Sequence, residues 1–177
     1  MPFAIELGLD PVSAAIVQET RQQLTADALR LVLEPHRAGP HVTLATCARL
    51  DVAACRQELA ELAASSPPPA VHFASLGVFP ADRSVVFLAP VVTDDLLLLH
   101  RRFHERFRAY AEDSGTLYLP GQWVPHCTLA ERIERAAVPQ VIAICQRLPL
   151  PLSARLDTIG ILEFPSLRRH ATLPFTG

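Results

Sequence analysis

Two patterns of hydrophobic residues alternate along the chain. Runs rich in Val, Ile, Leu and Phe, bounded by Gly, Pro or Asp, are typical of β-strands, whereas apolar residues that recur every three or four positions are typical of helices. We predict strands over Phe3–Leu9, His41–Ala48, Val71–Val78, Val85–Ala89, His126–Glu131, Arg155–Glu163 and Arg169–Pro174. We predict helices over Val12–Leu33, Val52–Ala64 (capped by Asp51), Asp94–Glu112 and Val138–Arg147.

This order of elements occurs twice. Each half reads strand, helix, strand, helix, strand, and the second copy begins near Val85. The sequence therefore predicts an α+β fold made of a duplicated β-α-β-α-β unit. We expect a single domain over residues 1–177 with two pseudo-symmetric lobes, about 1–84 and 85–177, between which strands can be exchanged. The Pro67-Pro68-Pro69 break is too short to separate independent domains.

A nearly identical hexad lies at the same place in each half. Pro40-His41-Val42-Thr43-Leu44-Ala45 and Pro125-His126-Cys127-Thr128-Leu129-Ala130 differ only at the third position. Alternate residues of a strand point the same way, so each hexad is expected to present its histidine and its threonine on one face and to bury the residues between them. A duplicated unit would bring His41, Thr43, His126 and Thr128 together around one pocket.

Two imidazoles that flank a pocket suit the cleavage of a phosphodiester. A neutral histidine can take a proton from the attacking water or hydroxyl, and a protonated histidine can give one to the departing oxygen. The threonine hydroxyls can donate hydrogen bonds to the non-bridging oxygens, where negative charge accumulates. This scheme uses neither a metal nor a cofactor, and we predict none.

The pattern His-x-Thr-Leu alone is not diagnostic, because a third copy, His170-Ala171-Thr172-Leu173, lies near the C-terminus. This copy lacks the preceding proline and the following alanine, and it has no counterpart in the other half. We therefore expect the paired hexads to form the site and the third copy to be structural.

The paired hexads, about half a chain apart, resemble those of the 2H phosphoesterase superfamily, which includes the bacterial RNA 2',3'-cyclic phosphodiesterases, once called 2'-5' RNA ligases. The resemblance implies antiparallel strands that line a central cleft, with helices packed outside. It also implies that His41 and His126 are the catalytic pair and that Thr43 and Thr128 bind the phosphate.

Four further residues are weaker candidates for contacts with a substrate. Arg132 has the same strand parity as His126, so it could bind phosphate if the strand extends that far; a solvated or ion-paired arginine is the alternative. Arg37 precedes the first hexad in a loop. Trp123 and Tyr118 precede the second hexad and could stack on a base, although packing under the loop is the commoner role of such residues.

Three other residues are expected to be structural. His100 and His104 lie one helical turn apart, a spacing that can bind a metal, but we expect a surface or half-buried pair instead. Cys127 lies between His126 and Thr128, and strand alternation should turn its thiol into the core, where it is no nucleophile.

Composition narrows the range of partners. Half of the residues are hydrophobic, the formal net charge is −2, and the 16 Lys+Arg residues are all arginine. Proteins that hold long nucleic acids are usually basic, so we expect a nucleotide or an RNA end with a cyclic phosphate, and no long duplex. No signal peptide is apparent and no apolar run approaches the ~20 residues of a membrane span, so we expect a cytoplasmic monomer.

The leading hypothesis is a metal-independent phosphodiesterase that opens a 2',3'-cyclic phosphate, on an RNA end or a small nucleotide, to a monoester. Two alternatives remain open. One is a nucleotide- or RNA-binding module without turnover. The other is a 2'-5' RNA ligase, which would use the same pair of histidines in the reverse direction.

Overall fold

The structure, a computed structural model, describes residues 2–26 and 38–177. Its strands are β1 (Phe3–Leu9), β2 (His41–Cys47), β3 (Arg49–Leu50), β4 (Ala70–Phe79), β5 (Arg83–Pro90), β6 (Ala111–Glu112), β7 (Cys127–Glu134), β8 (Leu152–Glu163) and β9 (Arg168–Pro174). Its α-helices are α1 (Pro11–Ala26), α2 (Val52–Ala64), α3 (Asp94–Phe107) and α4 (Val138–Cys145). Two short 3-10 turns are η2 (Thr116–Tyr118) and η3 (Arg135–Ala137).

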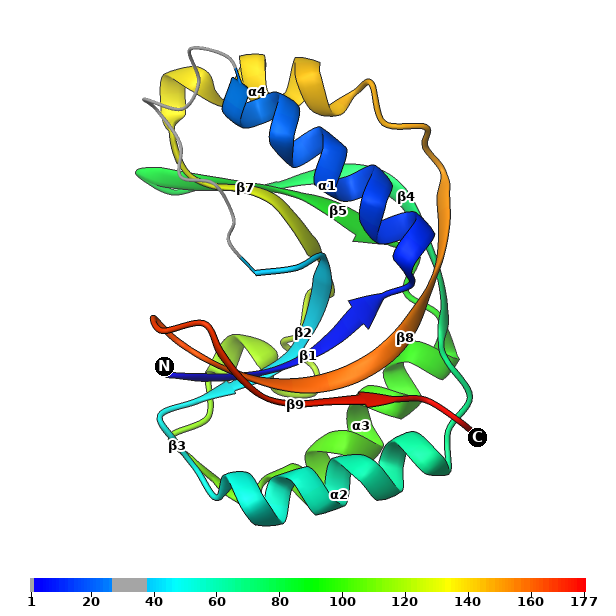
Figure 1. Cartoon of the computed structure of the whole chain (residues 1–177). Helices are drawn as coiled ribbons and strands as arrows, with labels where there is room; N and C mark the ends of the chain where they lie inside the picture. The colour runs from blue at the N-terminus through cyan, green and yellow to red at the C-terminus, as the bar shows by residue number, and fades with distance from the viewer. Residues whose placement is uncertain (1, 27–37) are drawn as a thin grey trace.

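One antiparallel sheet forms the frame of the molecule. Within the described residues its strands lie in the order β2-β1-β8-β4-β5-β7, and β9 pairs with β8. Strand β8 joins two groups of strands, because Leu152–Arg155 pair with β4 whereas the segment from Leu156 to Glu163 pairs with β1. Figure 1 shows β8 bending between these two groups, so that the sheet curls around its interior.

The curl of the sheet brings its end strands together. Strands β2 and β7 stand at opposite ends of the strand order, and yet they are in contact. The first hexad lies on β2 and the second leads into β7. The closure of the sheet therefore determines where the candidate site forms.

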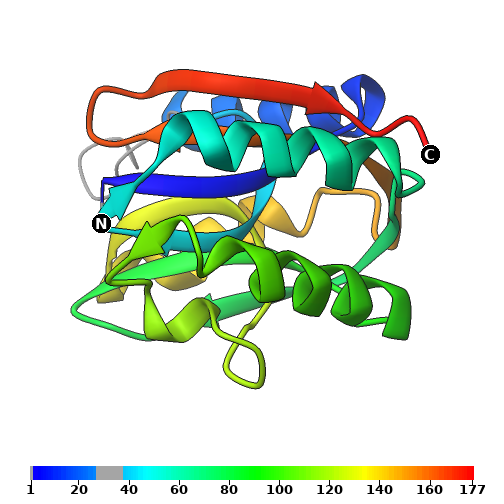
Figure 2. The same cartoon turned by 90° about the horizontal axis from the view of Figure 1, so that it is seen from below.

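The helices cover the outer faces of the two groups of strands (Figures 1 and 2). Helices α1 and α4 pack against each other and against β7, while α2 packs on β8 and β9 and lies beside α3. Asp51 caps α2 by accepting a hydrogen bond from the Ala54 N–H, and Thr93 caps α3 in the same way. None of the described helices is long and apolar enough to cross a membrane.

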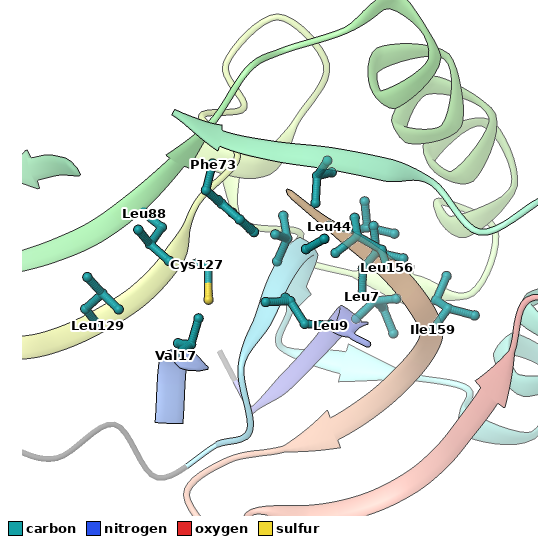
Figure 3. Packing of buried hydrophobic residues seen from close by; sticks show 14 of the residues in the cluster. Leu7, Leu9, Val17, Leu44, Phe73, Leu88, Cys127, Leu129, Leu156 and Ile159 are labelled. Atoms are coloured by element: carbon teal, nitrogen blue, oxygen red, sulfur yellow. The ribbon is translucent and has the colours of Figure 1, made fainter. Parts of the chain in front are cut away.

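Side chains from both groups of strands meet in one hydrophobic core (Figure 3). Leu7 of β1, Leu44 of β2, Phe73 of β4 and Leu156 of β8 are completely buried. Val17 of α1 closes the core on the side of β7. Protein interiors are packed as closely as organic crystals, so a substitution that changes the volume of one of these side chains is expected to destabilise the fold.

The predicted fold class is confirmed, and the strand bounds agree with the prediction to within a few residues. Two helices are shorter than predicted, and the one expected over Val138–Arg147 ends at Cys145. The helix expected over Asp94–Glu112 ends at Phe107, because Ala111–Glu112 leave it to pair with Arg49–Leu50. The helix expected over Val12–Leu33 is α1 as far as Ala26, and the remainder lies outside the described residues.

Strand pairing crosses the predicted boundary between the halves of the chain. Strand β4 of the first half pairs with β5 of the second. Strand β8 of the second half pairs with β1 of the first, and β9 pairs with β8. Each of the two groups of strands thus contains strands from both halves. The division into lobes near residue 84 stays a prediction.

We predict that Phe73→Ala lowers the free energy of unfolding by about 3–5 kcal/mol, because the substitution leaves a cavity at the centre of the core. Urea denaturation followed by circular dichroism measures the change. Val12→Ala is the control, since Val12 is 74% exposed and should change stability by less than about 0.5 kcal/mol. Equal effects of the two substitutions would contradict this view of the core.

Candidate active site

The two hexads face a single cavity of about 780 Å³. His41, Thr43, His126 and Thr128 all line it, and so does Arg132. The structure therefore brings together the two imidazoles and the two hydroxyls that lie about half a chain apart in the sequence.

Strand alternation delivers these side chains as the sequence predicts. His41 is the first residue of β2, and His126 directly precedes β7. The residues that alternate with them in each hexad point into the core and are at most 1% exposed: Val42, Leu44, Cys127 and Leu129. A one-residue shift of either strand would exchange the two sets of side chains.

Both histidines are oriented by the same local hydrogen bond. The Nδ1–H of His41 donates to the Gly39 carbonyl at 2.6 Å, and the Nδ1–H of His126 donates to the Val124 carbonyl at 2.7 Å. A carbonyl oxygen only accepts, so Nδ1 carries a hydrogen in both rings. Nε2 is therefore the nitrogen at which each histidine could take or give a proton.

The two strands of the site are tied together from behind by Arg21 of α1, which is only 4% exposed. Its Nη1 donates to the Ala38 carbonyl at 2.9 Å, next to the first hexad. Its Nε donates to the Thr128 carbonyl at 3.1 Å, and Nη2 contacts the same oxygen. One guanidinium thus sets the separation of the segments that carry His41 and Thr128.

Sequence reasoning missed Arg21. A signal was present, because Arg21 follows Val17 by four positions and precedes Leu24 by three, which places it on the buried face of the helix. A charged residue on an apolar face needs a buried partner, and here the partners are backbone carbonyls.

The Cys127 thiol lies in the same layer behind the cavity. It is within hydrogen-bonding reach of the Arg21 side chain and of the His41 backbone N–H. Burial raises the pKa of this thiol, so it stays protonated and does not act as a nucleophile. The expectation that Cys127 points into the core is confirmed.

Arg132 reaches the cavity through a β-bulge and not through simple alternation. Ser84 pairs with Ile133 and Val86 with Ala130, so two residues of β7 stand opposite one of β5. Arg132 has a φ of 54°, in the left-handed region, and both Glu131 and Arg132 line the cavity. Bulges often redirect side chains next to functional sites. That Arg132 binds phosphate stays a prediction.

The two aromatic candidates lie in different places. Tyr118 lines the cavity. Trp123 does not line it: its indole stacks on His100 with ring centroids 4.0 Å apart, and its Nε1–H donates to the Thr43 carbonyl at 2.9 Å. Trp123 thus supports the backbone of β2 beside the site, and base stacking by either residue stays a prediction.

His100 and His104 are both buried, at 2% and 8% exposure, so the expectation of a surface or half-buried pair was wrong. The Nε2 atom of His100 hydrogen-bonds the Tyr118 carbonyl at 3.0 Å, and that of His104 hydrogen-bonds the Leu44 carbonyl at 3.2 Å. Burial, with the neighbouring His104 adding to it, lowers the pKa of His100 to about 4. The pair joins α3 to both sides of the site.

The remaining sequence candidates lie elsewhere. His170, in the third copy of the pattern, does not line the cavity and pairs with Glu163, its Nε2 2.8 Å from a carboxylate oxygen. Arg37 lies outside the described residues. Phe79 and Phe87 contact the ring of His126 with centroids 4.9 and 5.3 Å away, which the sequence did not indicate.

Comparisons with known proteins place this geometry in context. A family model described as the 2'-5' RNA ligase superfamily matches residues 9–166. A crystal structure described as a phosphoesterase aligns with a TM-score of 0.62 at 18% identity, covering 99% of this chain and 95% of the other. Usb1 of Kluyveromyces marxianus aligns with a TM-score of 0.55 at 12% identity, covering 98% and 96%. No curated protein sequence matches.

We predict that Arg21→Met lowers the free energy of unfolding by about 2–4 kcal/mol, because it leaves the buried carbonyls of Ala38 and Thr128 without their donor. Urea denaturation measures the loss. Arg56→Met is the matched control, as Arg56 is an exposed arginine on a helix and should change stability by less than about 0.5 kcal/mol. Comparable stability of the two variants would show that Arg21 does not hold the strands.

We predict that stability falls as the pH drops from 6.5 toward 4. The unfolded state protonates His100 near its ordinary pKa of 6.5, while the folded state does so only near pH 4, so acid favours unfolding in that window. The loss is on the order of 1 kcal/mol per pH unit. Urea denaturation at pH 7 and pH 5 measures it, and His100→Gln should reduce the slope. An unchanged slope would contradict the buried, neutral state.

Proposed function

Because the chain belongs to the 2'-5' RNA ligase superfamily, we propose that it is a metal-independent phosphodiesterase that hydrolyses a 2',3'-cyclic phosphate on a small nucleotide or an RNA end. The observation that carries the proposal is the shared orientation of His41 and His126. Both rings line one cavity and hold a hydrogen on Nδ1, which leaves Nε2 to exchange protons with a bound phosphodiester.

The proposed reaction adds one water to the cyclic ester. One imidazole takes a proton from the water at Nε2 as the water oxygen attacks phosphorus. The other imidazole, protonated at the start, gives its Nε2 proton to the ribose oxygen as the bond between that oxygen and phosphorus breaks. The product is a phosphate monoester with a free hydroxyl, and the two histidines have exchanged protonation states. Proton exchange with solvent restores them.

The polar residues of the cavity have distinct tasks in this scheme. The hydroxyls of Thr43 and Thr128 would donate hydrogen bonds to the non-bridging oxygens, where charge increases in the transition state. Arg132 is the one arginine among the described lining residues, and its guanidinium would offset the charge of the phosphate.

The rest of the cavity suits a nucleoside. Its lining includes Leu117, which is 75% exposed, Val124, which is 50% exposed, and Tyr118. Exposed apolar side chains beside a phosphate site provide contacts for a base or a ribose face. The chain's near-neutral charge also favours a nucleotide or an RNA end over a long duplex.

We predict that His41→Ala and His126→Ala each lower kcat for a 2',3'-cyclic nucleotide by about 10²–10⁴-fold, because each removes one partner of the acid-base pair. His170→Ala is the matched control, since it alters the same sequence pattern away from the cavity and should keep full activity. A panel of 2',3'-cyclic nucleotides and a short RNA with that end, analysed by chromatography, measures turnover with and without EDTA.

Full activity of either cavity variant would refute the assignment, and so would loss of activity in EDTA. Tight binding of nucleotide without turnover by the wild type would favour a binding module instead. A 2'-5' linked product from RNA substrates would identify a ligase.

A further inference from the structure

A buried carboxylate lies directly behind one of the two histidines. Glu6 is on β1, where its sequence neighbours Ile5 and Leu7 are completely buried, and Glu6 itself is only 2% exposed. It stands opposite Thr43 in the pairing of β1 with β2. A charged side chain in this position costs free energy unless partners compensate it, so its contacts require an explanation.

The two oxygens of Glu6 have different surroundings. Oε1 accepts a hydrogen bond from Nη1 of Arg169 on β9, at 2.6 Å. Gly160 of β8 lies beneath this arginine, and a Cβ there would be 2.8 Å from the Ala171 carbonyl and 3.7 Å from Nη1. The glycine is thus required by the close approach of the β9 backbone, which brings Arg169 over β8 to Glu6.

Oε2 of Glu6 is buried and has no hydrogen-bond partner among the described residues. It lies 3.5 Å from Nδ1 of His41, the nitrogen whose hydrogen is donated to Gly39. An unsatisfied buried acceptor is costly and rare, and such groups often have a functional reason. Here the oxygen is placed to act by its charge on the imidazole of His41, since an adjacent carboxylate favours the protonated ring.

We infer that Glu6 is a positioning residue that keeps His41 protonated before the reaction, so that His41 is the general acid and His126 the general base. Arg169, by sharing the charge of Glu6, limits the strength of this effect. The inference rests on the proposed function, because it names the direction in which protons move through that site. A histidine that already holds its proton is the donor to the leaving ribose oxygen, and water must lose its proton to the other ring.

Other charged and titratable groups also face His41 or share its cavity. Among the described residues, Tyr118, His126, Glu131 and Arg132 line the cavity, and Arg21 of α1 and Cys127 of β7 lie behind it. Glu6→Gln and Arg169→Gln leave all of them in place. The two substitutions remove opposite charges from the same side of His41, so their effects on this ring should have opposite signs.

The test compares the pH dependence of the wild type with that of these two variants. The high-pH limb of kcat/KM reports the group that must be protonated in the free enzyme. We predict that Glu6→Gln moves this limb to lower pH by about one pH unit and that Arg169→Gln moves it to higher pH. Glu163→Gln is the matched control, because Glu163 pairs with His170, does not line the cavity and should leave the profile unchanged.

A second readout does not depend on turnover. Histidine ring resonances followed by NMR give the titration midpoint of His41, which should move in the same opposite directions in the two variants. Midpoints that both stay unchanged, or that move the same way, would overturn the inference. If Glu6→Gln fails to fold, as judged by circular dichroism, the direction of the shift in Arg169→Gln decides the question.

The outcomes separate the two proposals. A wild type that hydrolyses no cyclic phosphate, with His41 midpoints that shift as predicted, would refute the proposed function and keep the electrostatic role of Glu6. An active wild type in which only the low-pH limb moves would make His41 the base and overturn the assignment of roles.

Discussion

The site depends on the contact between β2 and β7, the two end strands of a curled sheet. These two strands are not hydrogen-bonded neighbours in the sheet, so other groups must fix the distance between them. The guanidinium of Arg21 does so by donating to the Ala38 carbonyl, just before the first hexad, and to the Thr128 carbonyl within the second. The proposed reaction needs this fixed separation, since displacements of about 1 Å are costly in catalysis.

Behind this contact lies a layer of buried polar groups that serves orientation more than stability. Arg21 and Glu6 carry opposite charges, and each interacts mainly with groups that hold the site: backbone carbonyls for one, His41 and Arg169 for the other. Buried charges are weak sources of stability because desolvation offsets their attraction. In the proposed function they would place and charge the two imidazoles, which local hydrogen bonds orient in the same way.

Much of the fold and the centre of the site could be predicted because both follow from local patterns. Strand alternation is enough to direct His41 and Thr43 to one face and Val42 to the other. The features that escaped prediction arise from contacts between distant segments. The bulge that carries Arg132, a residue the sequence did name, exists only where β7 pairs with β5, and Glu6 meets Arg169 only because β9 pairs with β8. The burial of His100 likewise depends on carbonyls from other segments.

The path of β8 has a consequence for how the molecule unfolds. One strand supplies hydrogen bonds to β4 with its first residues and to β1 with its later ones, so both groups of strands depend on it. Because both groups share this strand, we expect them to unfold together as one cooperative unit. A denaturant or protease that opens either group of strands is therefore expected to separate His41 from His126.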